Sequence, residues 1–329
     1  MAYFFSLVPV LLFLACLYLL DSFKLVSHKF LIVSIFWGIL SAGLSYLANN
    51  ALIDHFSISY EILMRYAAPV VEEIIKALLV VLLIRVRRIG FSIDAAIYGF
   101  AIGAGFALVE NIVYIAQMSS DVNMIVWLLR GFGTAIMHGG CTALLAMIMI
   151  MGVQRDRSAV LALLPGLVAA VIIHSMFNHF LLNPFLQTAL IITVLPITFL
   201  LVFKQSTLML QDWLEIEFSN EIDMLKMIRR GAFKDTRAGQ YLSSIKHHYS
   251  PEMIVDMYWY ISLYLELSIK AKRNMMLKEN GLPILPEQGI REKLIELKQL
   301  RKQIGKVGEL SLQPLVRMNH RELWKLNQL

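Results

Sequence analysis

The stretch Val70-Val71-Glu72-Glu73-Ile74-Ile75-Lys76-Ala77-Leu78-Leu79 decides how the rest of this sequence is interpreted. Two adjacent carboxylates and a lysine lie here inside an apolar run, residues 67–84, that is long enough to cross a bilayer. An ionisable side chain at the centre of a bilayer costs about 2.5–3.5 kcal/mol on insertion scales, so such residues persist where they face a protein interior or a water-filled cavity. The helix that carries them is therefore a candidate functional site.

The composition is that of an integral membrane protein. Of the 329 residues, 58% are hydrophobic and 16% are charged, and the mean hydropathy is +0.64. A soluble domain carries more charge than this. The net charge of +6 does not indicate a nucleic-acid partner, because most Lys and Arg residues lie in short loops between apolar runs or in the C-terminal third. Both cysteines lie inside apolar runs, so no disulfide framework is expected.

Seven windows of mostly apolar residues predict membrane-spanning helices, at residues 3–20, 30–49, 67–84, 95–117, 124–153, 160–182 and 185–203. The fifth window is overlong and contains Arg130-Gly131-Phe132-Gly133, so we expect it to begin as an interfacial turn. The predicted fold is all-α: a polytopic helical membrane domain of about seven spans in residues 1–203, followed by a charge-rich helical region in residues 204–329. An amphipathic helix is expected around residues 291–302.

The short loops predict the orientation. The loops after the first, third and fifth spans carry seven Lys or Arg residues, whereas those after the second, fourth and sixth carry two, Arg65 and Arg130. Because positively charged loops remain in the cytoplasm, we expect the N-terminus outside the cell membrane and the C-terminal region in the cytoplasm.

With this orientation, polar residues from four spans fall at one depth. Glu72, Glu73, Glu110, His138 and His174 lie about five to eight residues below the outer edge, which is roughly 8–12 Å at the rise of an α-helix. Side chains four residues apart share a helix face, so Lys76 lies beside Glu72, and Asn178 lies beside His174. Lys76 is expected to neutralise one of the two adjacent glutamates. Asn178 either orients His174 or bonds to a neighbouring helix.

This set of residues suits two kinds of hydrolytic site. In an acid/base site, Glu72 or Glu73 takes a proton from a water molecule that attacks a carbonyl, and the histidines bind that water or stabilise the oxyanion. In a zinc site, Glu110, His138 and His174 are the metal ligands, and a glutamate of the adjacent pair is the base. Both stay open, because the ligands would come from three helices with no local spacing to recognise.

A function from another class remains as the alternative. Buried Glu, His and Lys residues also form proton relays, so the cluster is compatible with a secondary transporter or an ion pathway. Such folds usually contain internal repeats, and the sequence contains no convincing one.

The same residues carry a resemblance to a known family. The series Glu72-Glu73-x-x-Lys76, Phe106-x-x-x-Glu110-Asn111, His138 and His174-x-x-x-Asn178, on four successive spans, resembles the motifs of the PrsW family of intramembrane proteases, related to the CAAX-protease and bacteriocin-processing superfamily. The resemblance implies proteolysis of a membrane-anchored protein, such as an anti-sigma factor in an envelope stress response. It places the essential double glutamate on Glu72 and Glu73, and the histidines on His138 and His174. Glu110 stands where the wider superfamily has histidine, which leaves open whether a metal is bound. Residues 204–329 have no counterpart in these motifs.

Overall fold

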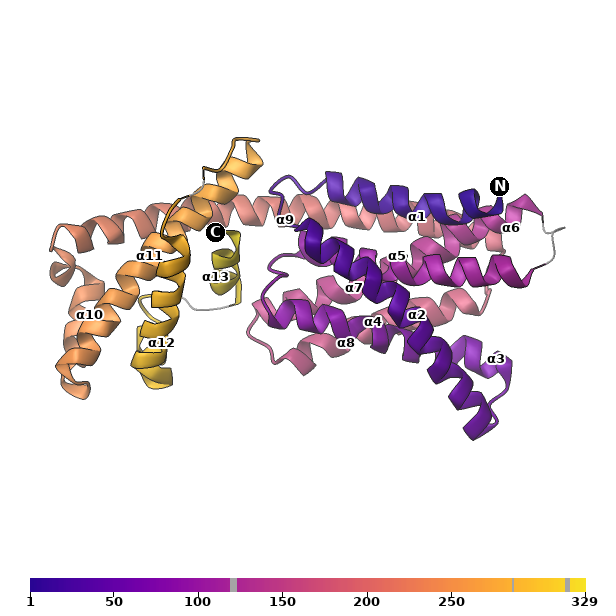
Figure 1. Cartoon of the computed structure of the whole chain (residues 1–329), viewed down its shortest axis with the longest axis horizontal. Coiled ribbons are helices and arrows are strands. Elements are labelled where there is room, and N and C mark those ends of the chain that lie inside the picture. Colours follow the sequence, from indigo (N-terminus) through magenta and orange to yellow (C-terminus); the bar gives the residue numbers. More distant parts are fainter. Residues whose placement is uncertain (119–122, 286, 317–319) are drawn as a thin grey trace. The chain divides into compact units, whose positions relative to one another are not determined.

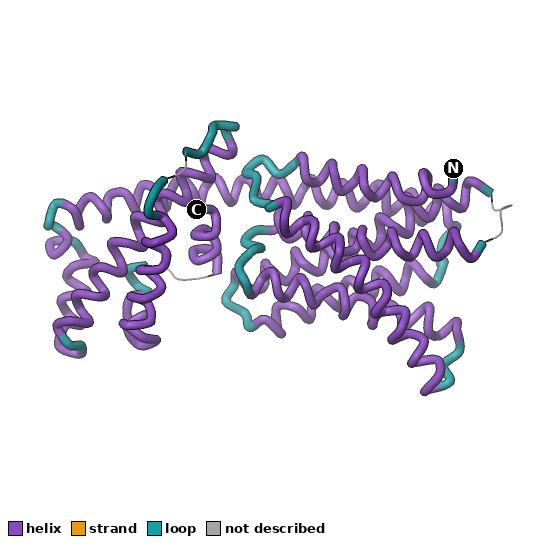
Figure 2. The backbone as a smooth tube through the Cα atoms, in the orientation of Figure 1, coloured by secondary structure: helices purple, strands orange, loops and turns teal. Residues whose placement is uncertain are grey.

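A computed structural model describes residues 1–118, 123–285, 287–316 and 320–329. The regular elements within these residues are all helices, joined by loops, and none is a strand (Figure 2). The prediction of an all-α fold is confirmed. The chain separates into two compact units, Met1–Ser206 and Thr207–Leu329, and the boundary between them falls inside helix α9 (Pro184–Arg229).

The first unit is a helical bundle (Figure 1). Its helices are α1 (Ala2–Leu19), α2 (His28–Phe56), α3 (Tyr60–Ile62), α4 (Ala68–Arg85), α5 (Ser92–Gln117), α6 (Met124–Leu129), α7 (Ala135–Gln154), α8 (Ala159–Asn178) and the first part of α9. Six helical segments of the described chain are long and apolar enough to cross a membrane: α1, α2, α5, α6 with α7, α8 and α9. The remaining predicted span corresponds to α4, an 18-residue helix that carries three ionisable residues, Glu72, Glu73 and Lys76, in its interior.

Helices α5 and α7 form the interior of this bundle. They pack along each other, and α5 also packs against α1 and α2. Small residues allow this close approach, because without a side chain at these positions the backbones can touch. A Cβ atom on Gly103 of α5 would lie 2.2 Å from the carbonyl oxygen of His138 in α7. Close packing of these two helices thus fixes the position of a predicted site residue.

The outer helices present apolar side chains on their exposed faces. Exposed residues include Phe36 and Leu47 of α2, Leu164 and Ile172 of α8, and Leu201 of α9. A continuous apolar exterior is unfavourable in water and suits the hydrocarbon of a bilayer. The exposed faces of the first unit are therefore compatible with a membrane environment.

Two π-helical segments interrupt the α-helices of this unit. Segment η1 (Leu63–Ala67) leads into α4, and segment η2 (Arg130–Thr134) leads into α7. The sequence predicted a turn at Arg130, but the chain remains helical there, because a π turn takes up an extra residue without breaking the helix. Helix α8 holds η1 in place: Ser175 Oγ donates to the carbonyl oxygen of Arg65 at 2.6 Å, and Asn178 Nδ2 donates to that of Met64 at 2.9 Å.

The second unit contains the rest of α9 and four further α-helices, α10 (Arg237–Ile245), α11 (Pro251–Glu279), α12 (Ile290–Leu312) and α13 (His320–Lys325). Short 3₁₀ segments lie at Phe233–Asp235, Lys246–His248 and Leu326–Gln328. The apolar stretch of α11 forms its core, with Met257, Tyr260 and Leu267 fully or almost fully buried. Helix α12 is the predicted amphipathic helix and packs against α11 through Leu297 and Ile304. This unit therefore has a hydrophobic core of its own.

Candidate active site

The predicted site residues gather at one end of the first unit. Glu72 and Glu73 lie near the start of α4, and His138 lies in the first turn of α7. Glu110 and His174 lie near the ends of α5 and α8. The contacts described below join all five side chains, so the common depth inferred from the sequence corresponds to real proximity.

His174 lies between the two adjacent glutamates. Its Nδ1 is 3.0 Å from Oε1 of Glu73, and its Nε2 is 3.8 Å from Oε2 of Glu72. Glu73 is fully buried, and Lys76 and Thr142 also contact its carboxylate, with Lys76 Nζ at 2.6 Å from Oε1 and Thr142 Oγ1 at 3.4 Å from Oε2. Glu73 is thus surrounded by partners, whereas Glu72 is 14% exposed and has room for another.

His138 lies between a cation and a carboxylate. Its Nδ1 is 3.2 Å from Lys76 Nζ, and its Nε2 is 2.9 Å from Oε2 of Glu110. The ring also packs against Phe106 and, nearly perpendicular, against the ring of His174 with their centroids 4.7 Å apart. The side chain is almost fully buried, so these partners determine its orientation.

These contacts place one proton on each imidazole. A lysine ammonium only donates hydrogen bonds and a carboxylate only accepts them. His138 must therefore carry its proton on Nε2, facing Glu110, and a lone pair on Nδ1, facing Lys76. His174 likewise carries a proton on Nδ1, which donates to Glu73, whereas its Nε2 lies 3.8 Å from Oε2 of Glu72, beyond hydrogen-bond distance. Each histidine thus has one nitrogen that donates to a carboxylate: Nε2 of His138 to Glu110, and Nδ1 of His174 to Glu73.

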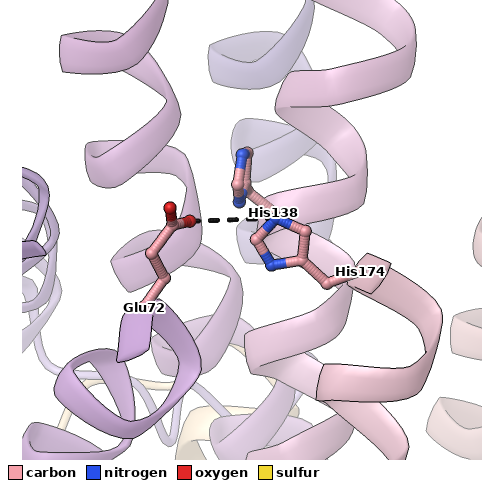
Figure 3. A group of neighbouring side chains, drawn as sticks. All are labelled: Glu72, His138 and His174. Carbon is pink, nitrogen blue, oxygen red and sulfur yellow. Dashed lines mark ion pairs between the residues drawn. The ribbon is translucent and has the colours of Figure 1, made fainter. Parts of the chain in front are cut away.

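Glu72, His138 and His174 form a group that can hold a metal ion (Figure 3). One potential ligand atom of each lies within 4.8 Å of the others, and they come from three different helices. Two imidazoles and one carboxylate are the ligand set of several catalytic zinc sites. Carboxylates on the far nitrogens of ligating histidines are also typical of zinc sites, since they orient the rings and raise their basicity. The residues present fit a metal ion.

One contact sets a condition on metal binding. Both nitrogens of His138 have partners, Lys76 on Nδ1 and Glu110 on Nε2. Coordination through this ring requires that one of these hydrogen bonds be given up. The ammonium of Lys76 retains Glu73 as a partner at a shorter distance if it releases Nδ1.

The glutamate that lies with the two histidines is not the one used in the zinc hypothesis drawn from the sequence. That hypothesis used Glu110 as the ligand and a member of the adjacent pair as the base. In the structure Glu72 belongs to the three-residue group, and Glu110 contacts the outer nitrogen of His138. The position of a residue along a helix predicts the depth of its side chain in the membrane. It does not predict the direction in which the side chain points around the helix axis.

Asn178 lies outside the group. Its amide donates to the carbonyl oxygen of Met64 in η1, so it joins α8 to the segment that precedes α4. The sequence left two roles open for Asn178, orienting His174 or bonding to a neighbouring helix, and this hydrogen bond is of the second kind. Its role in the site stays a prediction from the sequence.

Two residues of this site were not identified from the sequence. Thr142, one turn after His138, bonds to Glu73, and its helical spacing from His138 was an available signal. Arg130 lies with its Nη2 3.3 Å from Oε1 of Glu110. A charged residue within an apolar window was the signal for it, but the expected turn placed it at the membrane edge.

The family comparison agrees with the residues of this site. Residues 27–203, more than half of the chain, match the PrsW-protease family model, described as the PrsW family intramembrane metalloprotease. Comparison with curated proteins and with solved structures returned no significant match. The matched region contains Glu72, His138 and His174 and the residues that contact them. Helix α1 lies outside it. The chain belongs to the PrsW family of intramembrane metalloproteases and is therefore a multi-pass membrane peptidase.

Proposed function

We propose that the chain cleaves a membrane-anchored protein near the extracytoplasmic face, using a zinc ion held by Glu72, His138 and His174. The observation that carries this proposal is the convergence of these three side chains from α4, α7 and α8, with their ligand atoms within 4.8 Å of one another. A zinc ion in such a site lowers the pKa of a water molecule and polarises the scissile carbonyl.

The protein supplies the orientation of the two histidines. Glu73 holds Nδ1 of His174, and its contact with Lys76 keeps this carboxylate charged and stationary. Glu110 is the most exposed of the three glutamates, at 35% against 14% for Glu72 and none for Glu73. Both of its carboxylate oxygens have partners, Arg130 and His138, so we assign Glu110, like Glu73, to orienting an imidazole.

The side of the membrane follows from the charged loops. The site lies where α4 and α7 begin and where α5 and α8 end. With the Lys- and Arg-rich loops in the cytoplasm, this end of the bundle faces outward. We propose that residues 1–203 are the protease domain and that residues 204–329 are a cytoplasmic region. A cut near the outer face suits release of an anti-sigma factor, which we propose as the substrate class.

Two measurements on the full-length protein test this function. Purified wild-type protein is expected to contain one zinc ion per chain, and His174→Ala is expected to lose it. His179→Ala is the matched control, because His179 contacts Ser175 and Tyr66 and lies outside the group. N-terminal labelling of membrane proteins is expected to reveal new termini, near the outer ends of membrane anchors, in cells that express wild type and not in cells that express Glu72→Gln.

The outcomes separate this function from its alternative. Zinc-free protein, together with identical termini from wild type and Glu72→Gln, would remove the proteolytic assignment. Proton or metal flux into liposomes without any cleavage would indicate the transporter instead.

A further inference from the structure

Each histidine of the site is backed by a carboxylate, and each carboxylate is backed by a cation. On one side the order is His174, Glu73 and Lys76. On the other side it is His138, Glu110 and Arg130. Lys76 belongs to the motif series that the family resemblance rests on, whereas Arg130 belongs to none of these motifs. Its place in the series His138, Glu110 and Arg130 therefore needs an explanation of its own.

Arg130 is connected to helix α1 through hydrogen bonds made by Asn111. Its Nε donates to Asn111 Oδ1 at 3.0 Å, and Asn111 Nδ2 donates to the carbonyl oxygen of Ser6 in α1 at 2.9 Å. Its guanidinium lies over the ring of Tyr114, 3.8 Å from the centroid. A cation at this distance from an aromatic face is attracted to it.

The backbone at Arg130 is also fixed. It opens η2, and the next residue, Gly131, packs so tightly against α1 that a Cβ atom there would lie 2.0 Å from the carbonyl oxygen of Phe5. Arg130 is thus held by Asn111, Tyr114 and the packing of η2, none of which involves Glu110. Since its side chain is 14% exposed and that of Glu110 is 35% exposed, Arg130 is the anchored partner and Glu110 is the one that it holds.

The two oxygens of Glu110 face different partners. Oε1 faces Arg130 and Oε2 accepts the proton of His138 Nε2. This arrangement keeps the proton of His138 on Nε2 and leaves the lone pair on Nδ1. Without Arg130, a carboxylate as exposed as that of Glu110 is free to rotate toward water and to release the ring.

We propose that Arg130 is a positioning residue, which holds Glu110 so that His138 presents Nδ1 as a metal ligand. The proposal rests on the zinc site described under Proposed function. Its effect is on metal affinity through Glu110, because loss of a carboxylate contact behind a ligating histidine typically weakens metal binding about 10–100-fold.

Zinc affinity of the full-length protein in detergent, measured by competition with a chelator, tests this role without a substrate. Arg130→Gln is expected to weaken zinc binding about 10–100-fold, and Arg130→Lys to recover part of the loss, since it restores the charge but not the planar contacts. Arg65→Gln is the matched control. Arg65 also lies in a π-helical segment that leads into a site helix, but its side chain pairs with the exposed Glu61.

A double-mutant cycle identifies the path of the effect. If Arg130 acts through Glu110, the variant with both Glu110→Gln and Arg130→Gln binds zinc no more weakly than Glu110→Gln alone. Losses that multiply would overturn the proposal, because Arg130 would then act independently of Glu110. If Arg130→Gln binds zinc with wild-type affinity, the proposal for Arg130 is wrong, but the proposed zinc site is not affected. Absence of zinc from wild type would instead remove the proposed metal site itself.

Discussion

His174 Nδ1 lies 3.0 Å from Oε1 of Glu73, and both side chains are buried. The neighbouring carboxylate, Glu72, approaches the other nitrogen of the same ring. Adjacent residues on a helix differ in direction by about 100°. The two consecutive glutamates of α4 therefore reach different nitrogens of the same imidazole from α8. One glutamate contacts Nδ1 of the ring, and the other lies with the ring in the group formed by Glu72, His138 and His174.

The two glutamates are therefore expected to respond differently to the same substitution. Glu72→Gln removes a proposed ligand, so zinc is expected to be lost and cleavage abolished. Glu73→Gln keeps the ligand set but weakens the orientation of His174, so zinc affinity is expected to fall about 10–100-fold and excess zinc to restore part of the activity. Metal analysis and cleavage assays on both variants check this. The reverse pattern would exchange the two roles.

Lys76 is expected to be essential for stability. It is fully buried, as is Glu73, its partner at 2.6 Å. Removing one member of a buried ion pair leaves an uncompensated charge and costs about 3–5 kcal/mol. Lys76→Met is thus expected to lower the free energy of unfolding by about this amount, measured by denaturation in detergent micelles. Glu73→Gln combined with Lys76→Met, which removes both charges, is the control and should be more stable than Lys76→Met alone.

Gly103 is expected to tolerate no side chain. A Cβ there meets the carbonyl oxygen of His138 at 2.2 Å, and a backbone atom cannot rotate away as the end of a flexible side chain does. Gly103→Ala is expected to push α7 from α5, to destabilise the protein by about 1–3 kcal/mol or more, and to abolish cleavage.

Gly43 provides the control for this substitution. It lies in α2, and a Cβ atom added there would have nothing within 4 Å of it. Gly43→Ala is expected to leave activity unchanged and to stabilise the helix by about 0.5–1 kcal/mol. Equal melting temperatures and activities for the two variants would contradict the close packing of α5 on α7.

In the second unit, Lys325 is expected to hold the charged part of the core. It is fully buried, pairs with Glu322, and lies 3.0 Å from Oε1 of Glu221. Burial and the neighbouring ammonium of Lys325 lower the pKa of Lys272, which shares the carboxylate of Glu221 with Lys325. Lys325→Met is therefore expected to destabilise this unit by about 3–5 kcal/mol.

Hydrogen exchange in the full-length protein measures this effect. Amide protons of α11 are expected to exchange faster in Lys325→Met than in wild type, with exchange in the first unit unchanged. Lys226→Met is the control, because Lys226 and its partner Asp223 are largely exposed and such pairs contribute about 0–1 kcal/mol. Slow exchange of α11 in Lys325→Met would show that the buried charges are dispensable.

The sequence by itself determined the class of the protein and selected the candidate residues of its site. Hydropathy is a local property that needs only a window of about twenty residues, so the apolar windows predicted the helices. Ionisable residues inside such windows are costly, and this selected Glu72, Glu73, Glu110, His138 and His174 before any contact was known. The constant rise of a helix then predicted that they share a level.

Tertiary structure alone decided which of these side chains meet. Depth along a helix axis says nothing of rotation about it. The π-helical segments before α4 and α7 change that rotation, and they lie where the sequence predicted a loop, around Arg65, and a turn, at Arg130. The grouping of Glu72 with His138 and His174, the bond of Asn178 to η1 and the contact of Arg130 with Glu110 all depend on this rotation. Each joins residues from separate helices, whose arrangement around the bundle is set by packing between helices and not by any pattern within one of them.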